Sequence, residues 1–390
     1  MQIHFCFLIV RLLKESKNAN VNKEITDSIP DIVSKLSEIK ISNGTAFIGF
    51  DACIDNIVRV VKDKNGKDIS GYFSDSDQLG EFLLKLDNKS CGLELQTKLS
   101  KIGGNMVITG NALGDLGIKM ECLGTFGFPE ILPVFRTMSE NCTLTTIGDT
   151  ITATALEFNN SKIIMFDPGP YNNLKWEGIR DFIGINRIIE MISGKKLVSF
   201  VNWSEIDNSS LIWKGFLDDI LPHIKIDVTK PFFFTDFSDC SRKSKKEIQF
   251  ALELLDRFKK HFKVHISLNQ NEAALIAKAM GLKNYISDED FIKKLYRLIN
   301  TDVLVIHRTD DALAYDGVSY RNCETFFCKE PKILTGGGDN FNAGFCFSLF
   351  LGFELFESLL LANAVSGSYV KNGISPDVDH LLKFLDQKLK

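Results

Sequence analysis

Short, nearly continuous apolar runs bounded by turn residues recur along the chain. They lie at 45–50, 119–127, 196–203, 231–237, 262–268 and 302–307. Such runs are expected for strands that are buried on both faces of a parallel sheet. Segments with helical spacing of apolar residues, such as 241–261 and 271–281, separate several of them. Strands that alternate with helices predict an α/β fold with a mostly parallel sheet.

Two regions depart from this alternation. One is polar and turn-rich from Val58 to Lys101, and the other, 151–166, is typical of two strands joined at residues 159–161. Together they predict a small β-rich lid over one edge of the sheet. The predicted organisation is a body at 45–56, 103–149 and 169–390 and a lid at 57–102 and 150–168.

Residues 1–44 form a predicted N-terminal extension. Its first apolar run is broken by Arg11 after about ten residues, too short to span a bilayer. No basic segment precedes this run and no small-residue cleavage site follows, which argues against a signal peptide. Further along, 27–40 has the pattern of an amphipathic helix that docks on the body.

Composition narrows the function classes. Of 390 residues, 44% are hydrophobic and 25% are charged, as in an ordinary globular protein. A net charge of -4 gives no electrostatic reason to expect nucleic acid or an anionic membrane as the main partner. Nine cysteines without a CxxC pair indicate reduced thiols and a cytoplasmic protein. The six histidines show no metal-ligand spacing, so zinc is not expected.

The stretch "TGGGDNF" places Gly336, Gly337 and Gly338 directly before Asp339 and an apolar helix. The unpaired N–H groups and the positive dipole of a helix N-terminus form an anion site, and glycine lets a phosphate approach the backbone. A carboxylate beside such a site can accept the proton of an attacking hydroxyl in phosphoryl transfer. The alternative is a tight loop whose aspartate merely caps the helix. No GK[ST] follows, so this is not a Walker loop.

"TGGGDNFNAGF" resembles the C-terminal signature of the ribokinase-like (PfkB) carbohydrate kinase family. The resemblance implies a three-layer α/β/α domain with a mostly parallel central sheet and a small β-rich lid. It also implies that Asp339 is the catalytic base and that the backbone from Gly336 to Asp339 holds the γ-phosphate of ATP.

Two further segments extend the resemblance to the acceptor side. "IGGNMVITGNALGDLG", 102–117, is similar to the N-terminal signature, in which the glycine pair lies against the sugar. This implies that Gly104 and Asn105 bind the acceptor. "FIGFDACIDNIV", 47–58, resembles the first strand and the aspartate after it, which implies that Asp55 binds acceptor hydroxyls. Asp51 competes for that role.

Other matches concern the donor and the metal. "SLNQNEAALIA" resembles the family's N-x-x-E motif, which implies that Asn269 and Glu272 organise Mg²⁺ through water. Without the resemblance, the same pair would be a helix N-terminus with a capping pattern. The helix "LANAVSGSYVKNG" implies that Asn363 contacts the adenine. Asp236 and Asp239 are interpreted as architectural.

Some positions depart from the family pattern. Ile333 and Leu334 stand where many members have an Asp-Thr pair that helps to hold a monovalent cation, which argues against K⁺ activation. Ile108 replaces a second asparagine of the N-terminal signature. The segment "IHRTDDA", 306–312, lacks both glycines of the usual nucleotide loop, and Arg308 is available there for a phosphate.

The predicted function is therefore Mg²⁺-dependent phosphorylation of a small sugar or polyol by ATP. Two alternatives remain open: a nucleoside or sugar-phosphate kinase of the same fold, and a non-catalytic sugar or nucleotide sensor. The resemblance also suggests a homodimer formed through the lid.

Overall fold

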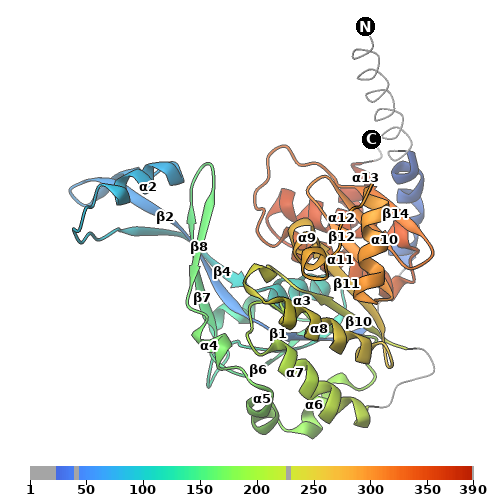
Figure 1. The fold of residues 1–390 in the computed structure, drawn as a ribbon. Coiled ribbons are helices and arrows are strands. Elements are labelled where there is room, and N and C mark those ends of the chain that lie inside the picture. The colour runs from blue at the N-terminus through green and yellow to red at the C-terminus, as the bar shows by residue number, and fades with distance from the viewer. Residues whose placement is uncertain (1–22, 39–43, 225–229, 389–390) are drawn as a thin grey trace.

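The computed structural model describes residues 23–38, 44–224 and 230–388. These residues form a layered α/β body, from which a smaller sheet projects (Figure 1). Residues 1–22, which include the apolar run of the predicted extension, lie outside the described part of the chain.

A nine-stranded sheet forms the centre of the body, in the order β14-β13-β12-β11-β10-β9-β1-β5-β6. From β6 to β12 all neighbouring strands are parallel, and β13 and β14 complete one edge in antiparallel fashion. The prediction of a mostly parallel sheet is confirmed, and each of the predicted apolar runs contains one of its strands. The strands are β1 (Thr45–Phe50), β5 (Lys119–Gly124), β6 (Cys142–Thr146), β9 (Leu197–Phe200), β10 (Phe232–Asp236), β11 (Lys263–Asn269), β12 (Val303–His307), β13 (Asp311–Tyr315) and β14 (Tyr320–Glu324).

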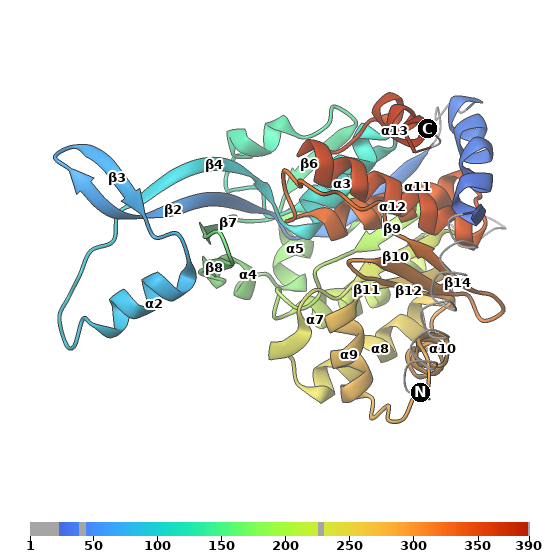
Figure 2. The same ribbon diagram turned by 90° about the horizontal axis from the view of Figure 1, so that it is seen from above.

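Helices cover both faces of this sheet, which gives the three layers expected from the family resemblance (Figure 2). Each face has its own core of buried side chains. One face carries α5 (Trp176–Ile183), α6 (Ile185–Ile192), α7 (Ser209–Gly215), α8 (Lys245–Phe258), α9 (Gln270–Ala279) and α10 (Asp288–Ile299). The other carries α3 (Asn105–Asp115), α11 (Gly337–Leu351), α12 (Leu355–Asn372) and α13 (Val378–Asp386).

A further helix at residues 23–38 lies on the second face. Its apolar side, with Ile29, Ile32 and Leu36, is buried in the core of that face, as its amphipathic pattern predicts. Lys35 adds an ion pair of 3.0 Å to Glu357 of α12.

The projecting sheet has the order β3-β2-β7-β8, and β4 pairs with β2. Val58, Phe73 and Phe158 belong to its own small core. β2 begins before the expected lid boundary at 57, because the residues from Cys53 onward already pair with β4 and β7. Its elements are β2 (Cys53–Asn65), β3 (Asp68–Tyr72), α2 (Ser76–Leu84), β4 (Leu95–Gly103), β7 (Ile151–Glu157) and β8 (Lys162–Phe166). β7 and β8 form the predicted hairpin.

The carboxyl ends of β1, β9, β10 and β11 lie beside the N-termini of α3, α9 and α11. Open parallel sheets bind their ligands at this edge. In this protein β2 and β4 leave the body at the same edge, so the projecting sheet borders the predicted site.

Candidate active site

The glycine turn precedes α11 as the sequence predicts, although the helix begins at Gly337 rather than after Asp339. Gly336 caps the helix with φ 93°, a left-handed conformation that favours glycine. A Cβ on Gly336 would lie 2.8 Å from the hydroxyl of Tyr369, and one on Gly338 would lie 3.1 Å from the ring of His307. The turn therefore needs glycine for its own packing, whatever it binds.

Side chains from three helices hold the carbonyl groups of this turn. Ser366 of α12 donates to the carbonyl of Gly337 at 2.9 Å, and Asn340 donates to that of Gly336 at 2.9 Å. Thr109 of α3 donates to the carbonyl of Asp339 at 3.4 Å. With the carbonyls fixed in this way, the direction of the amide groups is fixed as well.

Two amides of the turn remain free. The N–H of Gly337 donates to the carbonyl of Leu334 at 3.1 Å, so this predicted member of the anion hole is already paired. For the N–H groups of Gly338 and Asp339, the described residues provide no hydrogen-bond acceptor. Unpaired amides in the first turn of a helix form an anion-binding site.

Asp339 lies in this first turn and keeps part of its surface accessible. Desolvation raises the pKa of its carboxyl well above the usual value, and the charges of Asp236, Asp51, Glu272 and Asp55 raise it further. Such interactions require these acids to lie near one another. Asp339 and Asp55 are thus close enough for their charges to interact.

Asp55 projects from β2 and lies directly opposite Lys101 of β4. Burial raises the pKa of Asp55, and the charge of Lys101 opposes that rise. A Cβ on Gly103 would lie 2.5 Å from the carboxyl carbon of Asp55, and a Cβ on Gly104 would lie 2.7 Å from Asp51. The glycine pair is therefore required because two carboxylates pack against it.

The structure separates the roles of the two competing acids. Asp51 is fully buried, and its carboxylate accepts hydrogen bonds from the N–H of Met106 at 3.0 Å and from Asn202 at 2.9 Å. Burial raises its pKa to about 7. Asp55 is partly exposed, and it accepts a weak hydrogen bond from the thiol of Cys53 at 3.5 Å. Asp55 is thus the acid with oxygens available to a ligand.

Asn105 begins α3 and turns its amide nitrogen toward the end of β10. That nitrogen donates to Ser238 at 2.8 Å and lies 3.4 and 3.5 Å from the oxygens of Asp236. The side chain predicted to reach the acceptor is therefore also anchored to the sheet.

Asn269 and Glu272 form a reciprocal cap at the start of α9, which confirms the capping interpretation of this pair. Glu272 accepts from the backbone N–H of Asn269 at 2.9 Å and from its side-chain amide at 2.5 Å. Burial, followed by the charge of Asp236, raises the pKa of Glu272 to about 8. Within the described ranges, no three His, Cys, Asp or Glu side chains gather in a way that could hold a metal ion directly.

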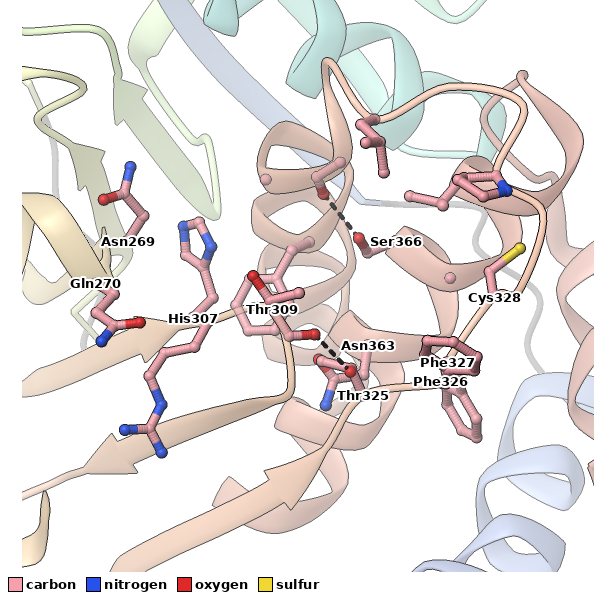
Figure 3. A pocket seen from close by; sticks show the side chains of 18 of the residues that line it. Asn269, Gln270, His307, Thr309, Thr325, Phe326, Phe327, Cys328, Asn363 and Ser366 are labelled. Carbon is pink, nitrogen blue, oxygen red and sulfur yellow. Dashed lines mark hydrogen bonds between the residues drawn. The ribbon is translucent and has the colours of Figure 1, made fainter. Parts of the chain in front are cut away.

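A pocket of about 500 Å³ extends from the glycine turn along α12. Figure 3 shows Asn269, Gln270 and His307 on one side of it, and Phe326, Phe327 and Cys328 on the other. Gly337 and Gly338 also line it. Gly337 and Gly338 of the predicted phosphate site and Asn269 of the predicted metal pair therefore line one cavity, whereas Glu272 is not part of its lining.

Asn363 also lines this pocket, but its amide nitrogen is committed to the protein. It donates to the carbonyls of Cys323 and Glu324 at 3.1 Å each. The predicted contact with a base could therefore not use that nitrogen unless these bonds broke.

Arg308 and Asp311 lie in the segment that lacks the two loop glycines, and they pair with each other. Nε and Nη2 of Arg308 each donate to one oxygen of Asp311 at 2.5 Å. Nη1 donates to Asp288 at 2.9 Å. Arg308 lines the pocket, but these bonds direct its charge toward two carboxylates rather than toward a phosphate.

Comparison with known proteins identifies the family. The family model described as prokaryotic ketohexokinase matches residues 21–388. The chain belongs to the prokaryotic ketohexokinase family. A ketohexokinase from Haloferax volcanii is 23% identical over 356 residues, which cover 88% of this chain and 92% of the relative. Membership of this ketohexokinase family makes the protein a sugar kinase.

Solved structures agree with the ketohexokinase family at the level of the fold. A ribokinase from Thermotoga maritima has a TM-score of 0.59 at 15% identity and covers 88% of this chain and 99% of its own. A candidate ribokinase II from Escherichia coli, in complex with ATP and Mg²⁺, has a TM-score of 0.57 at 12% identity, with coverage of 88% and 99%. The ribokinase-like fold expected from the sequence is confirmed.

Several residues at this ketohexokinase-family site were missed by sequence reasoning. Lys162 of β8 donates to the side chain of Thr335 at 2.9 Å, beside the glycine turn. Tyr369 of α12 donates to the carbonyl of Thr335 at 2.8 Å. Asp236, which was interpreted as architectural, accepts hydrogen bonds from residues of several elements, as that interpretation expects. The signal that could have found Asp236 was its place at the carboxyl end of a buried strand.

Proposed function

We propose that this protein transfers the γ-phosphate of ATP to a hydroxyl of a ketohexose. The observation that carries the proposal is the pair of unpaired amides on Gly338 and Asp339 in the first turn of α11, where Gly338 lines a nucleotide-sized pocket and Asp339 supplies a carboxylate. The preceding family assignment supplies the substrate class.

ATP would bind in the pocket along α12, with its phosphates at the glycine turn. Phe326 and Gly367, which lie against each other, line the same pocket and provide surface for the base. At the near end, the free amides of Gly338 and Asp339 would hold the γ-phosphate. Amides that are already oriented need no rearrangement as charge develops during transfer.

The ketohexose would bind between the projecting sheet and the start of α3. Asp55 offers carboxylate oxygens, and Asn105 is anchored beside it by Ser238. Polar groups that are partly withdrawn from water require partners, and the hydroxyls of a sugar supply them. Gly104 keeps the backbone at this point free of a side chain.

In the chemical step, Asp339 would act as general base. Its carboxylate takes the proton of the acceptor hydroxyl, and the oxygen of that hydroxyl bonds to the γ-phosphorus. The bond from this phosphorus to the oxygen that bridges to the β-phosphate breaks, so ADP leaves with the bridging oxygen. Burial, followed by the charges of nearby acids, raises the pKa of Asp339, which strengthens it as a base once it is ionised.

Lys101 and Lys162 supply positive charge at the same place. The charges of Asp55 and Asp339 both act on Lys101, whose pKa is lowered mainly by burial. Lys162 is held at Thr335, next to the turn. An ammonium group beside a phosphate cradle would stabilise the charge on the transferring phosphoryl group.

The residues at the start of α9 fit a role in binding Mg²⁺. Glu272 is a buried acid, and within the described residues no cation pairs with it. The oxygens of Glu272 and the amide oxygen of Asn269 are hard ligands of the kind that Mg²⁺ prefers. Because these oxygens already accept hydrogen bonds within the pair, they suit contact with Mg²⁺ through water better than direct ligation. When bound, Mg²⁺ would add positive charge beside the phosphates.

The projecting sheet would act as a lid that limits the access of water to the reaction. Its strand β8 exposes Ile163, Ile164 and Met165 in succession. A row of apolar side chains on an edge strand is suited to pairing with a second copy, so we infer a homodimer through this sheet.

In the described residues no helix is both long and apolar enough to cross a bilayer. Since ATP is the donor and the described cysteines are free, we place the enzyme in the cytoplasm.

One alternative in the same class has an observation in its favour. Lys101 and Lys162 would also suit an anionic acceptor, such as a sugar phosphate. The carboxylate of Asp55 beside them would repel the same anion, so a neutral sugar is the better fit.

The purified full chain should be tested with ATP and Mg²⁺ against ketohexoses, aldohexoses, sugar phosphates and nucleosides. We expect ADP formation to be fastest with a ketohexose such as D-fructose, and NMR of the product should show which hydroxyl carries the phosphate. Faster turnover of a sugar phosphate or nucleoside would overturn the acceptor assignment. Binding without turnover across the whole panel would identify a sensor.

A further inference from the structure

The carboxylate of Asp236 collects hydrogen bonds from four directions at the carboxyl edge of the sheet. It accepts from the backbone N–H of Asn202 at 3.2 Å, from Ser238 at 3.3 Å and from Asn342 at 2.8 Å. The amide of Asn105 is its fourth donor, at 3.4 and 3.5 Å. Asp236 is 6% exposed, so these protein groups replace water around it.

The backbone on both sides of this cluster is held in an unfavourable conformation. Asn202, after β9, has φ 56°, and Ser238, after β10, has φ 54°. Left-handed conformations cost free energy for residues other than glycine and tend to persist at functional sites. Here both strained residues hydrogen-bond to the carboxylate of Asp236.

The direction of these hydrogen bonds determines which way Asn105 faces. Asp236 accepts from Asn202, Ser238 and Asn342, and the amide nitrogen of Asn105 is the end that lies toward its oxygens and toward Ser238. Ser238 gives its proton to Asp236, so its oxygen accepts from that same NH₂ group at 2.8 Å. The carbonyl oxygen Oδ1 of Asn105 then points away from the cluster. No described residue donates to this oxygen, and Asn105 is partly exposed.

We propose that Asp236 is a positioning residue that makes Asn105 present only a hydrogen-bond acceptor to the sugar. This inference rests on the proposed function. The carboxylate of Asp55 also accepts hydrogen bonds. The sugar must therefore offer an O–H group to each of these two residues. A substituent that cannot donate, such as fluorine, is rejected at the hydroxyl that Asn105 contacts.

The test compares Asp236→Asn with the exchange variant Asn105→Asp/Asp236→Asn. In the single variant, the asparagine introduced at position 236 offers an NH₂ group, so the Asn105 amide turns and presents its own NH₂ group to the sugar. We expect kcat/KM for D-fructose to fall about 10- to 100-fold while the KM for ATP changes little. The exchange variant again presents a hydrogen-bond acceptor to the sugar at position 105. Its kcat/KM for D-fructose should recover to within about threefold of the parent value.

Asp239→Asn is the matched control, because Asp239 lies on the same segment but caps a short helix through Ser241 at 3.0 Å. Its kinetic constants should stay near those of the parent. Thermal unfolding of every variant shows which ones are folded, and Ser238→Ala tests the same orientation if Asp236→Asn does not fold.

A series of fluorinated sugars gives a readout that a merely structural role would not change. Each analogue of D-fructose has fluorine in place of one hydroxyl. The parent should discriminate by about 10- to 100-fold against each of the analogues fluorinated at the hydroxyls that Asn105 and Asp55 contact, and Asp236→Asn should reduce one of these two ratios to below about threefold.

Equal rises in KM for ATP and for sugar, or unchanged discrimination among the analogues, would overturn the inference while leaving the kinase intact. Failure of the parent both to bind and to phosphorylate any sugar would instead refute the proposed function itself.

Discussion

Lys162 on the projecting sheet donates a hydrogen bond of 2.9 Å to Thr335, which directly precedes the glycine turn. The lysine and the turn are far apart in sequence, so this contact links the projecting sheet to the predicted phosphate site. An ammonium group in this position lies within reach of the place where charge would develop during transfer.

Replacement of Lys162 by methionine should lower kcat about 10- to 100-fold, because one charge that stabilises the transferring phosphoryl group is lost. Methionine keeps most of the side-chain length, and Lys162→Arg, which keeps the charge, should retain most of the activity. Steady-state kinetics with D-fructose and ATP measure both effects. Full activity of Lys162→Met would show that the lysine only links the two parts of the protein.

Gly336→Ala should damage both stability and activity. The added Cβ would need a left-handed backbone and would lie 2.8 Å from the hydroxyl of Tyr369. Gly352 offers a matched control, since it has φ 67° and a Cβ added there would have no atom within 4 Å. We expect Gly352→Ala to cost about 1–2 kcal/mol of the free energy of unfolding without loss of kcat. Gly336→Ala should cost more and lower kcat, as urea unfolding and kinetics would show, and similar behaviour of both variants would count against a specialised turn.

The ion pair of Arg308 with Asp311 should stabilise the fold rather than bind ATP. Arg308→Met should lower the free energy of unfolding by about 1 kcal/mol, as expected for a partly exposed pair. The KM for ATP should change by less than about threefold, since all three guanidinium nitrogens face carboxylates. Asp311→Asn should have the same effects on the free energy of unfolding and on the KM for ATP. A KM for ATP raised about tenfold or more at unchanged stability would instead mark Arg308 as a nucleotide ligand.

Glu272 should make the metal-free protein less stable as the pH rises. Its pKa in the folded state is about 8, above its ordinary value of 4.5, because burial disfavours the charged form. The folded state therefore binds this proton more tightly, and the stabilisation is full below the ordinary pKa and is lost as the pH rises through the folded-state pKa. Melting temperatures of the parent and Glu272→Gln, measured in EDTA from about pH 5 to pH 9, should diverge with rising pH. Parallel curves would contradict the shift.

Sequence reasoning predicted most of the central sheet because its strands are buried on both faces and therefore appear as continuous apolar runs. It did not predict β6, β13 and β14, which lie at or next to the edges of the sheet and fall outside the predicted apolar runs. The predicted start of the projecting sheet, at residue 57, was later than the structure has it. β2 continues from the body into the projecting sheet, and Asp55 interrupts neither its pairing nor its direction.

At the site, glycines and strand ends gave strong signals, so Asp339, Asp55 and the glycine turn were found. The cluster around Asp236 was not, because Asn202 and Ser238 adopt left-handed conformations that a sequence without glycine does not reveal. The pairing of Arg308 with Asp311 was also hidden. Both lie in the segment that lacks the expected loop glycines, and only the folded hairpin shows that the two side chains meet.

The proposed mechanism requires Asp339 to remove a proton from a sugar hydroxyl beside a phosphate held by free backbone amides. The measurement that examines this step without the others is the single-turnover rate of Asp339→Asn, taken together with its affinity for ATP. We predict a rate at least about a thousandfold below that of the parent and a Kd for ATP within about threefold, because asparagine keeps the shape but cannot accept the proton. A rate close to that of the parent would show that Asp339 is not the base.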